Sequence, residues 1–215
     1  MSIPKLFATV ILLISLSLAL ALQSCQKEKV KIENLRCEYM HNPIGIDTPS
    51  PRFTWNYETI SGHDFKQAFV QLYLSTNKDA LFNSASTDVW KSERTKSGKS
   101  FITLDSAYRL QSQTIYYWKI VAWDEDENQE VVSSINQFET AFINSSDWQA
   151  QWISDNQNID APQSPMLRKA FEIKSKQIEK ARLYISAAGY YDASINGKPV
   201  APDVFLAPGY THYDK

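Results

Sequence analysis

The chain has 215 residues, of which 43% are hydrophobic, 13% aromatic and 21% charged. This composition is typical of a soluble globular protein of one or two domains. Its 22 basic and 24 acidic residues leave a net charge of −2 and form no basic cluster in the sequence, which argues against nucleic-acid binding because phosphate neutralisation needs a positive surface.

The first 24 residues have the pattern of a targeting segment. Lys5 provides a short positive region, and an apolar run follows from residue 6 to residue 22, as in secretory signals. A membrane anchor is the alternative, because this run is close to the roughly 17-residue minimum for a spanning helix.

The residues that follow favour a lipoprotein signal. LQSC (residues 22–25) resembles a bacterial lipobox, in which the cysteine is acylated and becomes the first residue of the mature chain. We therefore predict a signal peptide over residues 1–24, lipid attachment at Cys25 and a hydrated tether over residues 25–31. Acyl chains hold a protein at a bilayer by burying their methylene groups, so we expect an exported lipoprotein, periplasmic or anchored to the outer membrane.

The chain has two cysteines, Cys25 and Cys37. If Cys25 carries lipid, Cys37 is unpaired, and we expect it to behave as a small buried hydrophobic residue rather than as a reactive thiol. A Cys25–Cys37 disulfide remains open only if the lipobox interpretation fails.

Short β-like runs separated by polar turns extend from Val30 to about Thr140. They cover residues 52–57, 68–75, 101–104, 115–123 and 131–140. Several short strands at this spacing predict a β-sandwich, which we place at residues 32–141. In the run 68–75 either alternate set of side chains could face the core.

The run 115–123 is the most informative of these strands. Alternation places Tyr116 and Trp118 on one face and Trp123 on the other. The spacing of Leu110, Thr114 and Tyr116 is that of a tyrosine corner, in which a tyrosine hydroxyl bonds to the backbone upstream of its strand. With Trp55 as a large core aromatic, these residues resemble a fibronectin type III domain.

A second domain is predicted over residues 147–215, after a polar linker. Strand-like runs occupy residues 166–173, 182–186 and 189–195, and Asn196-Gly197 is a strong hairpin signal because both residues tolerate positive φ. Because the sequence stops at Lys215, soon after this hairpin, we expect only the incomplete start of a second β-sandwich. The predicted fold class is therefore mainly β.

No catalytic residue, metal site or cofactor site is predicted. The acidic run at residues 124–128 matches the first half of an EF-hand loop, but Gln129 stands where the loop needs glycine and Ile135 where it needs a bidentate glutamate. A solvated hairpin turn explains this run. The sequence has no nucleophile elbow, and its histidines lack metal-ligand spacing.

Four residues near the end of the chain are candidate carbohydrate contacts: Tyr190, Tyr191, Asn196 and Asp203. Exposed aromatic rings stack on sugar faces, and amide or carboxylate groups bond to hydroxyls. The alternative is structural, since tyrosines also pack against neighbouring domains and Asn196 and Asp203 can shape a turn. For Trp123 we favour domain packing over sugar binding.

An ordered set of motifs resembles the opening of bacterial α-L-rhamnosidases of glycoside hydrolase family 78. The set comprises LRCEYMHNPIGID (35–47), PRFTW (51–55), TIYYWKI (114–120), DWQAQWI (147–153), LRKAF (167–171), ARLYIS (181–186), ASINGKPV (193–200) and LAPGYTHY (206–213). Two positions depart from the pattern: Ile44 stands where leucine is expected, and Lys91-Ser92-Glu93 lacks a glycine.

The resemblance implies a fibronectin-like sandwich and a second β-sandwich, followed in such enzymes by an (α/α)₆ barrel that cleaves terminal α-L-rhamnosides with inversion. The catalytic acids would belong to that barrel, so this chain alone is expected to be inactive, with rhamnose-containing polysaccharides or glycosides and the missing catalytic domain as partners. The alternatives are a glycan-binding surface lipoprotein without catalysis, and a spacer without a ligand.

Overall fold

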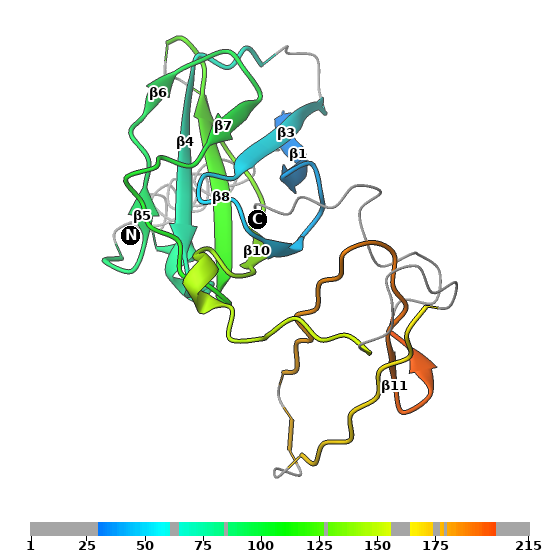
Figure 1. The fold of residues 1–215 in the computed structure, drawn as a ribbon. Helices are drawn as coiled ribbons and strands as arrows, with labels where there is room; N and C mark the ends of the chain where they lie inside the picture. The colour runs from blue at the N-terminus through cyan, green and yellow to red at the C-terminus, as the bar shows by residue number, and fades with distance from the viewer. Residues whose placement is uncertain are drawn as a thin grey trace, which may run out of the picture. The chain divides into compact units, whose positions relative to one another are not determined.

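The computed structural model describes residues 30–60, 65–83, 86–126, 129–155, 164–173, 177–178 and 180–200 (Figure 1). The predicted signal peptide and tether, Cys25 and Asp203 lie outside these residues. The chain divides into two units between Thr140 and Ala141, and each unit is described by itself. None of the described helices is long and apolar enough to cross a bilayer.

The first unit is a sandwich of two sheets. One sheet has the order β1-β3-β7, built from β1 (Val30–Cys37), β3 (Arg52–Thr59) and β7 (Phe101–Thr103). The other has the order β2-β10-β8-β4-β5, built from β2 (Ile44–Ile46), β10 (Asn136–Thr140), β8 (Ile115–Trp123), β4 (Phe69–Ser75) and β5 (Trp90–Lys91), with β6 (Thr95–Lys96) on β4 and β9 (Glu130–Val132) on β8. All pairs are antiparallel except β2 with β10.

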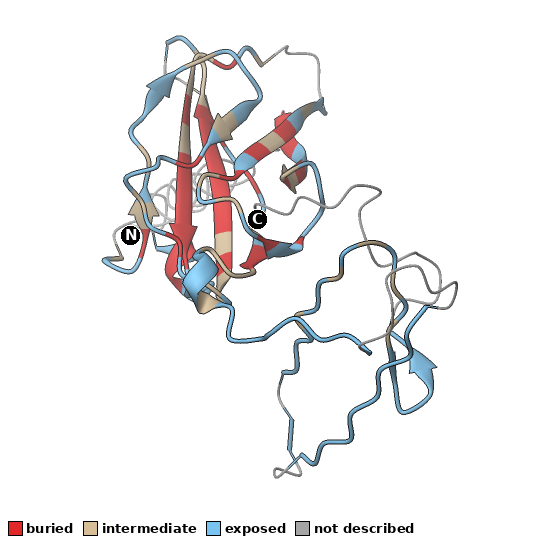
Figure 2. Cartoon of the chain, in the orientation of Figure 1, coloured by how far each residue is buried: buried red, intermediate tan, exposed pale blue. Residues whose placement is uncertain are grey.

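An aromatic core joins the two sheets. Phe53 of β3 lies with its ring centroid 4.6 Å from that of Trp118 on β8 and 5.7 Å from that of Phe138 on β10. Trp55 is 2% exposed, as predicted for the large core aromatic. Figure 2 shows the buried residues concentrated on the strands of this unit. Burial of such rings is the main favourable term in folding, worth about 1.5–3 kcal/mol for each large side chain.

The predicted tyrosine corner is present. The Tyr116 hydroxyl accepts a hydrogen bond of 2.8 Å from the backbone N–H of Gln111. The hydroxyl of Thr140, the last residue of β10, donates to the Gln111 carbonyl at 2.6 Å and accepts from the N–H of Thr114 at 2.9 Å. These bonds satisfy buried polar groups where the chain enters β8.

The inward face of β4 is the one formed by Val70, Leu72 and Leu74, each no more than 1% exposed. Tyr73, on the opposite face, is also buried, because the short helix η1 (Asp79–Phe82) covers that face with Leu81. This second cluster comprises Tyr73, Ala80, Leu81, Val89 and Val121. The sequence left the choice between the two faces open because both faces of β4 carry apolar side chains that the fold buries.

A lysine is buried in this outer cluster. Lys119 of β8 is 8% exposed, and its Nζ donates a 2.6 Å hydrogen bond to the carbonyl of Leu81. Burial lowers its pKa, because the charged ammonium loses its hydration. The ammonium also lies 5.1 Å from the centroid of the Tyr73 ring, where the ring's negative face is favourable to a cation.

Cys37 is the small buried residue that the sequence predicted. It is a free thiol, 1% exposed at the end of β1. Burial, together with the nearby Glu38 carboxylate, raises the pKa of the thiol well above its ordinary value. The neutral thiol therefore packs as a hydrophobic side chain.

In the second unit, the described residues form a short helix η2 (Ser145–Asp147) and one hairpin, β11 (Ser194–Ile195) with β12 (Lys198–Pro199). The hairpin confirms the Asn-Gly prediction: Asn196 and Gly197 have φ values of 51° and 75°, as a tight primed turn requires. The predicted strands at residues 166–173 and 182–186 carry no strand assignment in the described parts of the chain, because an extended run becomes a strand only when a partner accepts its hydrogen bonds.

Candidate functional site

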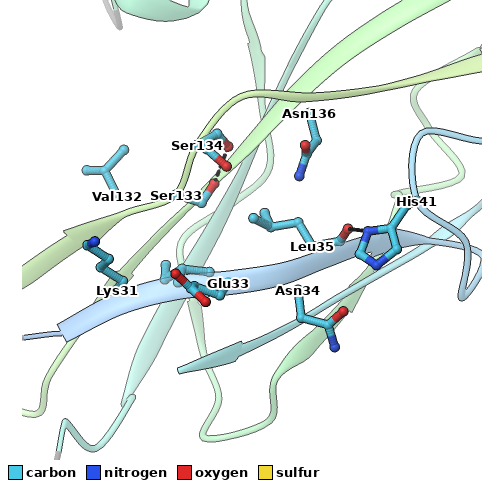
Figure 3. A pocket seen from close by; sticks show the side chains of 10 residues that line it. Lys31, Glu33, Asn34, Leu35, His41, Val132, Ser133, Ser134 and Asn136 are labelled. Carbon is cyan, nitrogen blue, oxygen red and sulfur yellow. Dashed lines mark hydrogen bonds between the residues drawn. The ribbon is translucent and has the colours of Figure 1, made fainter. Parts of the chain in front are cut away.

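An open groove lies in the first unit between β1 and the chain from Val132 to Asn136 (Figure 3). Its volume is about 600 Å³, within the range of roughly 300–1,000 Å³ that small-molecule sites occupy. Among the described residues it is lined by Lys31, Ile32, Glu33, Asn34, Leu35, His41, Val132, Ser133, Ser134 and Asn136.

The β1 wall of the groove is shaped by a β-bulge. Glu33 pairs with Asn56 and Arg36 with Thr54, so that Asn34 and Leu35 together oppose one residue of β3. Asn34 takes a φ of 52°, a left-handed conformation that asparagine tolerates better than most residues. The extra residue keeps Leu35 buried while Glu33 and Asn34 both remain exposed, which is how a bulge redirects side chains.

The opposite wall is shaped by a break in the ladder. The run 131–140, predicted as a single strand, is divided into β9 and β10 by residues 133–135. The Ser133 hydroxyl replaces a backbone acceptor: it accepts a 2.9 Å bond from the N–H of Ile120 and donates at 2.8 Å to the carbonyl of Ser134. Ser133 keeps one backbone bond to β8, because its N–H donates to the Ile120 carbonyl at 2.9 Å, so both backbone groups of Ile120 are satisfied where the strand is interrupted.

Figure 3 shows how the side chains meet. Lys31 and Glu33 lie along β1, and Val132, Ser134 and Asn136 lie along the facing chain. His41 stands at one end, with its Nδ1 at 3.1 Å from the Leu35 carbonyl oxygen. Since a carbonyl oxygen only accepts, Nδ1 is the donor in this contact.

Of the predicted carbohydrate residues, Tyr190, Tyr191 and Asn196 are not among those that line this groove, and Asp203 lies outside the described residues. Tyr190 is 69% exposed and Tyr191 is half-buried, with its hydroxyl donating to the Ile185 carbonyl at 3.3 Å. Asn196 occupies the hairpin turn described above. The sequence did not point to the groove, because its polar residues are scattered over β1 and residues 132–136 and match no motif.

Trp123 has one of its faces covered within the first unit. The Arg94 guanidinium lies 4.0 Å from the ring centroid, and the indole N–H donates a 2.9 Å hydrogen bond to Glu130 Oε2. At the end of β8, Glu125 and Asp126 lie in a turn, and Asp124 Oδ1 accepts a hydrogen bond of 3.1 Å from the N–H of Gln129. Asp124 thus has a structural role in the turn, as the sequence analysis predicted in preference to calcium binding.

Comparison with known proteins identifies the family to which this chain belongs. Two family models match the chain in order: the Rha78A-like, N-terminal immunoglobulin domain over residues 32–144, and the alpha-L-rhamnosidase N-terminal domain over residues 176–215. The chain belongs to the α-L-rhamnosidase family. The region it corresponds to is the N-terminal one, and its fold is an immunoglobulin-like, fibronectin type III-like sandwich followed by a short β start.

Individual similar proteins are also α-L-rhamnosidases. An α-L-rhamnosidase of Formosa agariphila is 31% identical over 98% of this chain, and one of Alteromonas sp. is 29% identical over 81% of it. The structure of the α-L-rhamnosidase from Dictyoglumus thermophilum matches 58% of this chain at 30% identity, with a TM-score of 0.51, and this match covers 14% of that chain. The present chain spans 24% of the Formosa protein's length and 20% of the Alteromonas protein's.

Proposed function

We propose that this chain is the non-catalytic N-terminal portion of an exported enzyme that hydrolyses terminal α-L-rhamnosides with inversion. The ordered match of the two N-terminal family models over residues 32–144 and 176–215 carries the proposal. A solved relative from Streptomyces avermitilis, 26% identical over 58% of this chain with a TM-score of 0.51, is complexed with L-rhamnose. By this proposal the substrates are rhamnose-bearing glycosides or polysaccharides.

The chemistry would take place outside the matched residues. In an inverting glycosidase one carboxylic acid protonates the leaving oxygen while a second carboxylate activates water, with the two groups about 6.5–9.5 Å apart. The groove described above offers no such pair, because Glu33 is the single acid among the described residues that line it. The catalytic barrel belongs to the part of such enzymes that this chain does not match.

The proposed position in the cell is the periplasm or the outer membrane, with lipid on Cys25. The support is the positive start, apolar run and LQSC sequence at the beginning of the chain. Tyr190, Tyr191, Asn196 and Asp203 remain proposed sugar contacts of the second unit. The exposure of Tyr190 supports a stacking role for this residue.

Rhamnosidase activity tests the function. We expect no hydrolysis of p-nitrophenyl α-L-rhamnopyranoside by the 215-residue chain, and hydrolysis by the product of the whole reading frame. Proton NMR of the first product should show the β-anomer of rhamnose, since inversion changes the configuration. A whole-frame product that binds rhamnosides without cleaving them would instead support the glycan-binding lipoprotein.

Metabolic labelling tests the anchor. Radioactive palmitate should enter the wild-type chain and not the Cys25→Ser variant, while Cys37→Ser, the matched control, should remain labelled. Labelling of Cys25→Ser at the wild-type level would exclude the lipobox interpretation.

A further inference from the structure

We propose that the groove between β1 and residues 132–136 binds a neutral saccharide through Glu33, Asn34, Asn136 and Lys31. The assignment comes from the groove's own chemistry and does not rest on the proposed rhamnosidase function. It places a sugar-binding surface in the first unit, whereas the carbohydrate candidates named from the sequence lie in the second.

The groove offers hydrogen-bonding groups that the folded unit does not use. Within the described parts of the chain, the side chains of Lys31, Glu33 and Asn136 make no hydrogen bond or ion pair. Asn34 uses its Oδ1 to accept a 3.0 Å bond from Arg36 Nε, which leaves its amide N–H groups for a ligand. This arrangement combines donors with acceptors, and vicinal sugar hydroxyls, each a donor and an acceptor, match such a set.

The charge of the groove favours a neutral ligand. Lys31 contributes one positive charge and Glu33 one negative charge. An anion such as a phosphate would be repelled by the Glu33 carboxylate, and a cation by the Lys31 ammonium. No group of three or more metal-ligating side chains occurs among the described residues, so the carboxylate has no partners with which to hold a divalent cation.

Apolar surface lies beside these polar groups. Val132 is 46% exposed at the groove, and Figure 3 shows it on the wall opposite β1, close to Lys31. The C–H face of a pyranose ring can cover such a side chain while its hydroxyls reach the amides and the carboxylate. The volume of about 600 Å³ accommodates a short saccharide.

An extended peptide is the competing ligand, because β1 and β9 each have one edge without a strand partner in the described residues. Addition of a strand needs a continuous row of backbone donors and acceptors. The bulge at Asn34 and the break at residues 133–135 interrupt that row on both walls. Charged side chains on an edge, such as Lys31 and Glu33, also oppose strand pairing. The two irregularities therefore disfavour a peptide and open the space for a compact ligand.

Saturation-transfer difference NMR tests the proposal on the chain from residue 26 to residue 215, because this measurement detects weak ligands. The probes are methyl α-L-rhamnopyranoside and maltotriose as neutral saccharides, trigalacturonate as a charged one, and an extended Thr-Val hexapeptide. We expect saturation transfer to the two neutral saccharides that exceeds the transfer to trigalacturonate and to the peptide.

Matched variants locate the site. Glu33→Gln keeps the side-chain shape but removes a charged acceptor, so the saccharide Kd should rise about tenfold. Asn136→Ala should weaken binding about threefold, since it removes neutral hydrogen bonds. The controls are Glu93→Gln, the same change at an exposed position outside the groove, and Gln137→Ala, the neighbouring residue on the other face of β10; both should leave the Kd unchanged.

Several results would overturn the assignment: no transfer to either neutral saccharide at millimolar concentration, stronger transfer to the peptide than to the saccharides, or equal losses in the groove variants and their controls. Thermal melting of each variant shows whether the fold is intact, and because Glu33 is exposed, its substitution should leave the melting temperature unchanged. Rhamnosidase activity of the whole reading frame is a separate measurement, so either proposal can fail without the other.

Discussion

Both units of this chain contain large aromatic side chains, but the first unit buries several of them in a core and the second leaves several of them exposed. In the first unit Trp55, Trp118 and Phe53 are at most 2% exposed. In the second, Trp152 is 76% exposed and Phe171 is 70% exposed. All the buried hydrophobic residues among the described ones lie between Val30 and Phe138, so apolar composition alone does not make a core.

The difference lies in strand pairing. The first unit closes two sheets over one another, so alternate side chains from both meet in one interior. The second unit pairs its described residues in one hairpin of two short strands, and an isolated hairpin is marginal in water. In residues 181–186 apolar and polar side chains alternate as in a strand, but no sheet among the described residues covers the apolar side.

Separating the two units gives the largest expected effect. Residues 30–140 alone should unfold cooperatively, because their core is made entirely within that range. Residues 141–215 alone should show no cooperative transition and should aggregate through exposed apolar side chains and unpaired edges. Circular dichroism during thermal melting, with light scattering, measures both. A monodisperse second unit with a sharp melting transition would contradict the conclusion that only the first unit forms its own core.

Tryptophan truncation sharpens the comparison. Trp55→Ala should lower the free energy of unfolding of the first unit by about 3–5 kcal/mol, because it leaves a cavity in the core. The matched change Trp152→Ala, at a residue 76% exposed, should alter it by less than about 0.5 kcal/mol. Urea denaturation of the chain from residue 26 measures both values, and equal effects would show that the second unit contributes to a shared core.

The tyrosine corner gives a smaller effect. Tyr116→Phe removes the hydroxyl that accepts from the Gln111 N–H, so the free energy of unfolding should fall by about 1–3 kcal/mol, the cost of a buried group without a partner. Tyr117→Phe, one residue away on the opposite face of β8, is the control and should be close to neutral. Denaturant unfolding curves that shift equally for both variants would count against the corner.

The smallest effect is confined to alkaline pH. Burial raises the pKa of Cys37 in the folded state, so its contribution is fully present below the unfolded-state pKa of about 8.5. Above that pH the unfolded chain releases the thiol proton and the folded chain retains it, so stability falls with rising pH. In residues 30–140, which contain this cysteine alone, Cys37→Ala should reduce the slope of unfolding free energy against pH between pH 8.5 and 10.

Native thiol reactivity is an independent check on Cys37. The folded segment should react with a disulfide reagent far more slowly than the urea-unfolded segment, because the thiolate forms only when the strand opens. Rapid reaction of the folded protein would show that β1 is open at its end.

Several features followed from the sequence because their causes are local. Alternation in residues 115–123 identified both faces of β8, and the spacing to Tyr116 predicted the bond to the Gln111 backbone. Asn196-Gly197 predicted its own turn because positive φ costs these two residues little. Ordered motifs from Leu35 onward predicted the family that the comparisons show.

Other features could not be predicted because they depend on pairing between distant segments. β1 was not predicted as a strand: Asn34 interrupts its alternation, and only the register against β3 reveals the extra residue as a bulge. The run 131–140 looked continuous, yet Ser133 divides it by bonding to Ile120 across the sheet. The groove arises where these two irregularities face each other, so no single segment carries its signal.

By itself, the sequence determined the mainly β class, the core aromatics, the tyrosine corner, the Asn-Gly hairpin and the kinship with α-L-rhamnosidase N-terminal regions. Each of these rests on periodicity, local spacing or motif order. Only the tertiary structure decided which apolar runs become strands, which face of β4 meets the main core and where a groove opens. Those outcomes depend on which partner each segment finds, and a backbone hydrogen bond or a buried face exists only when the partner is in place.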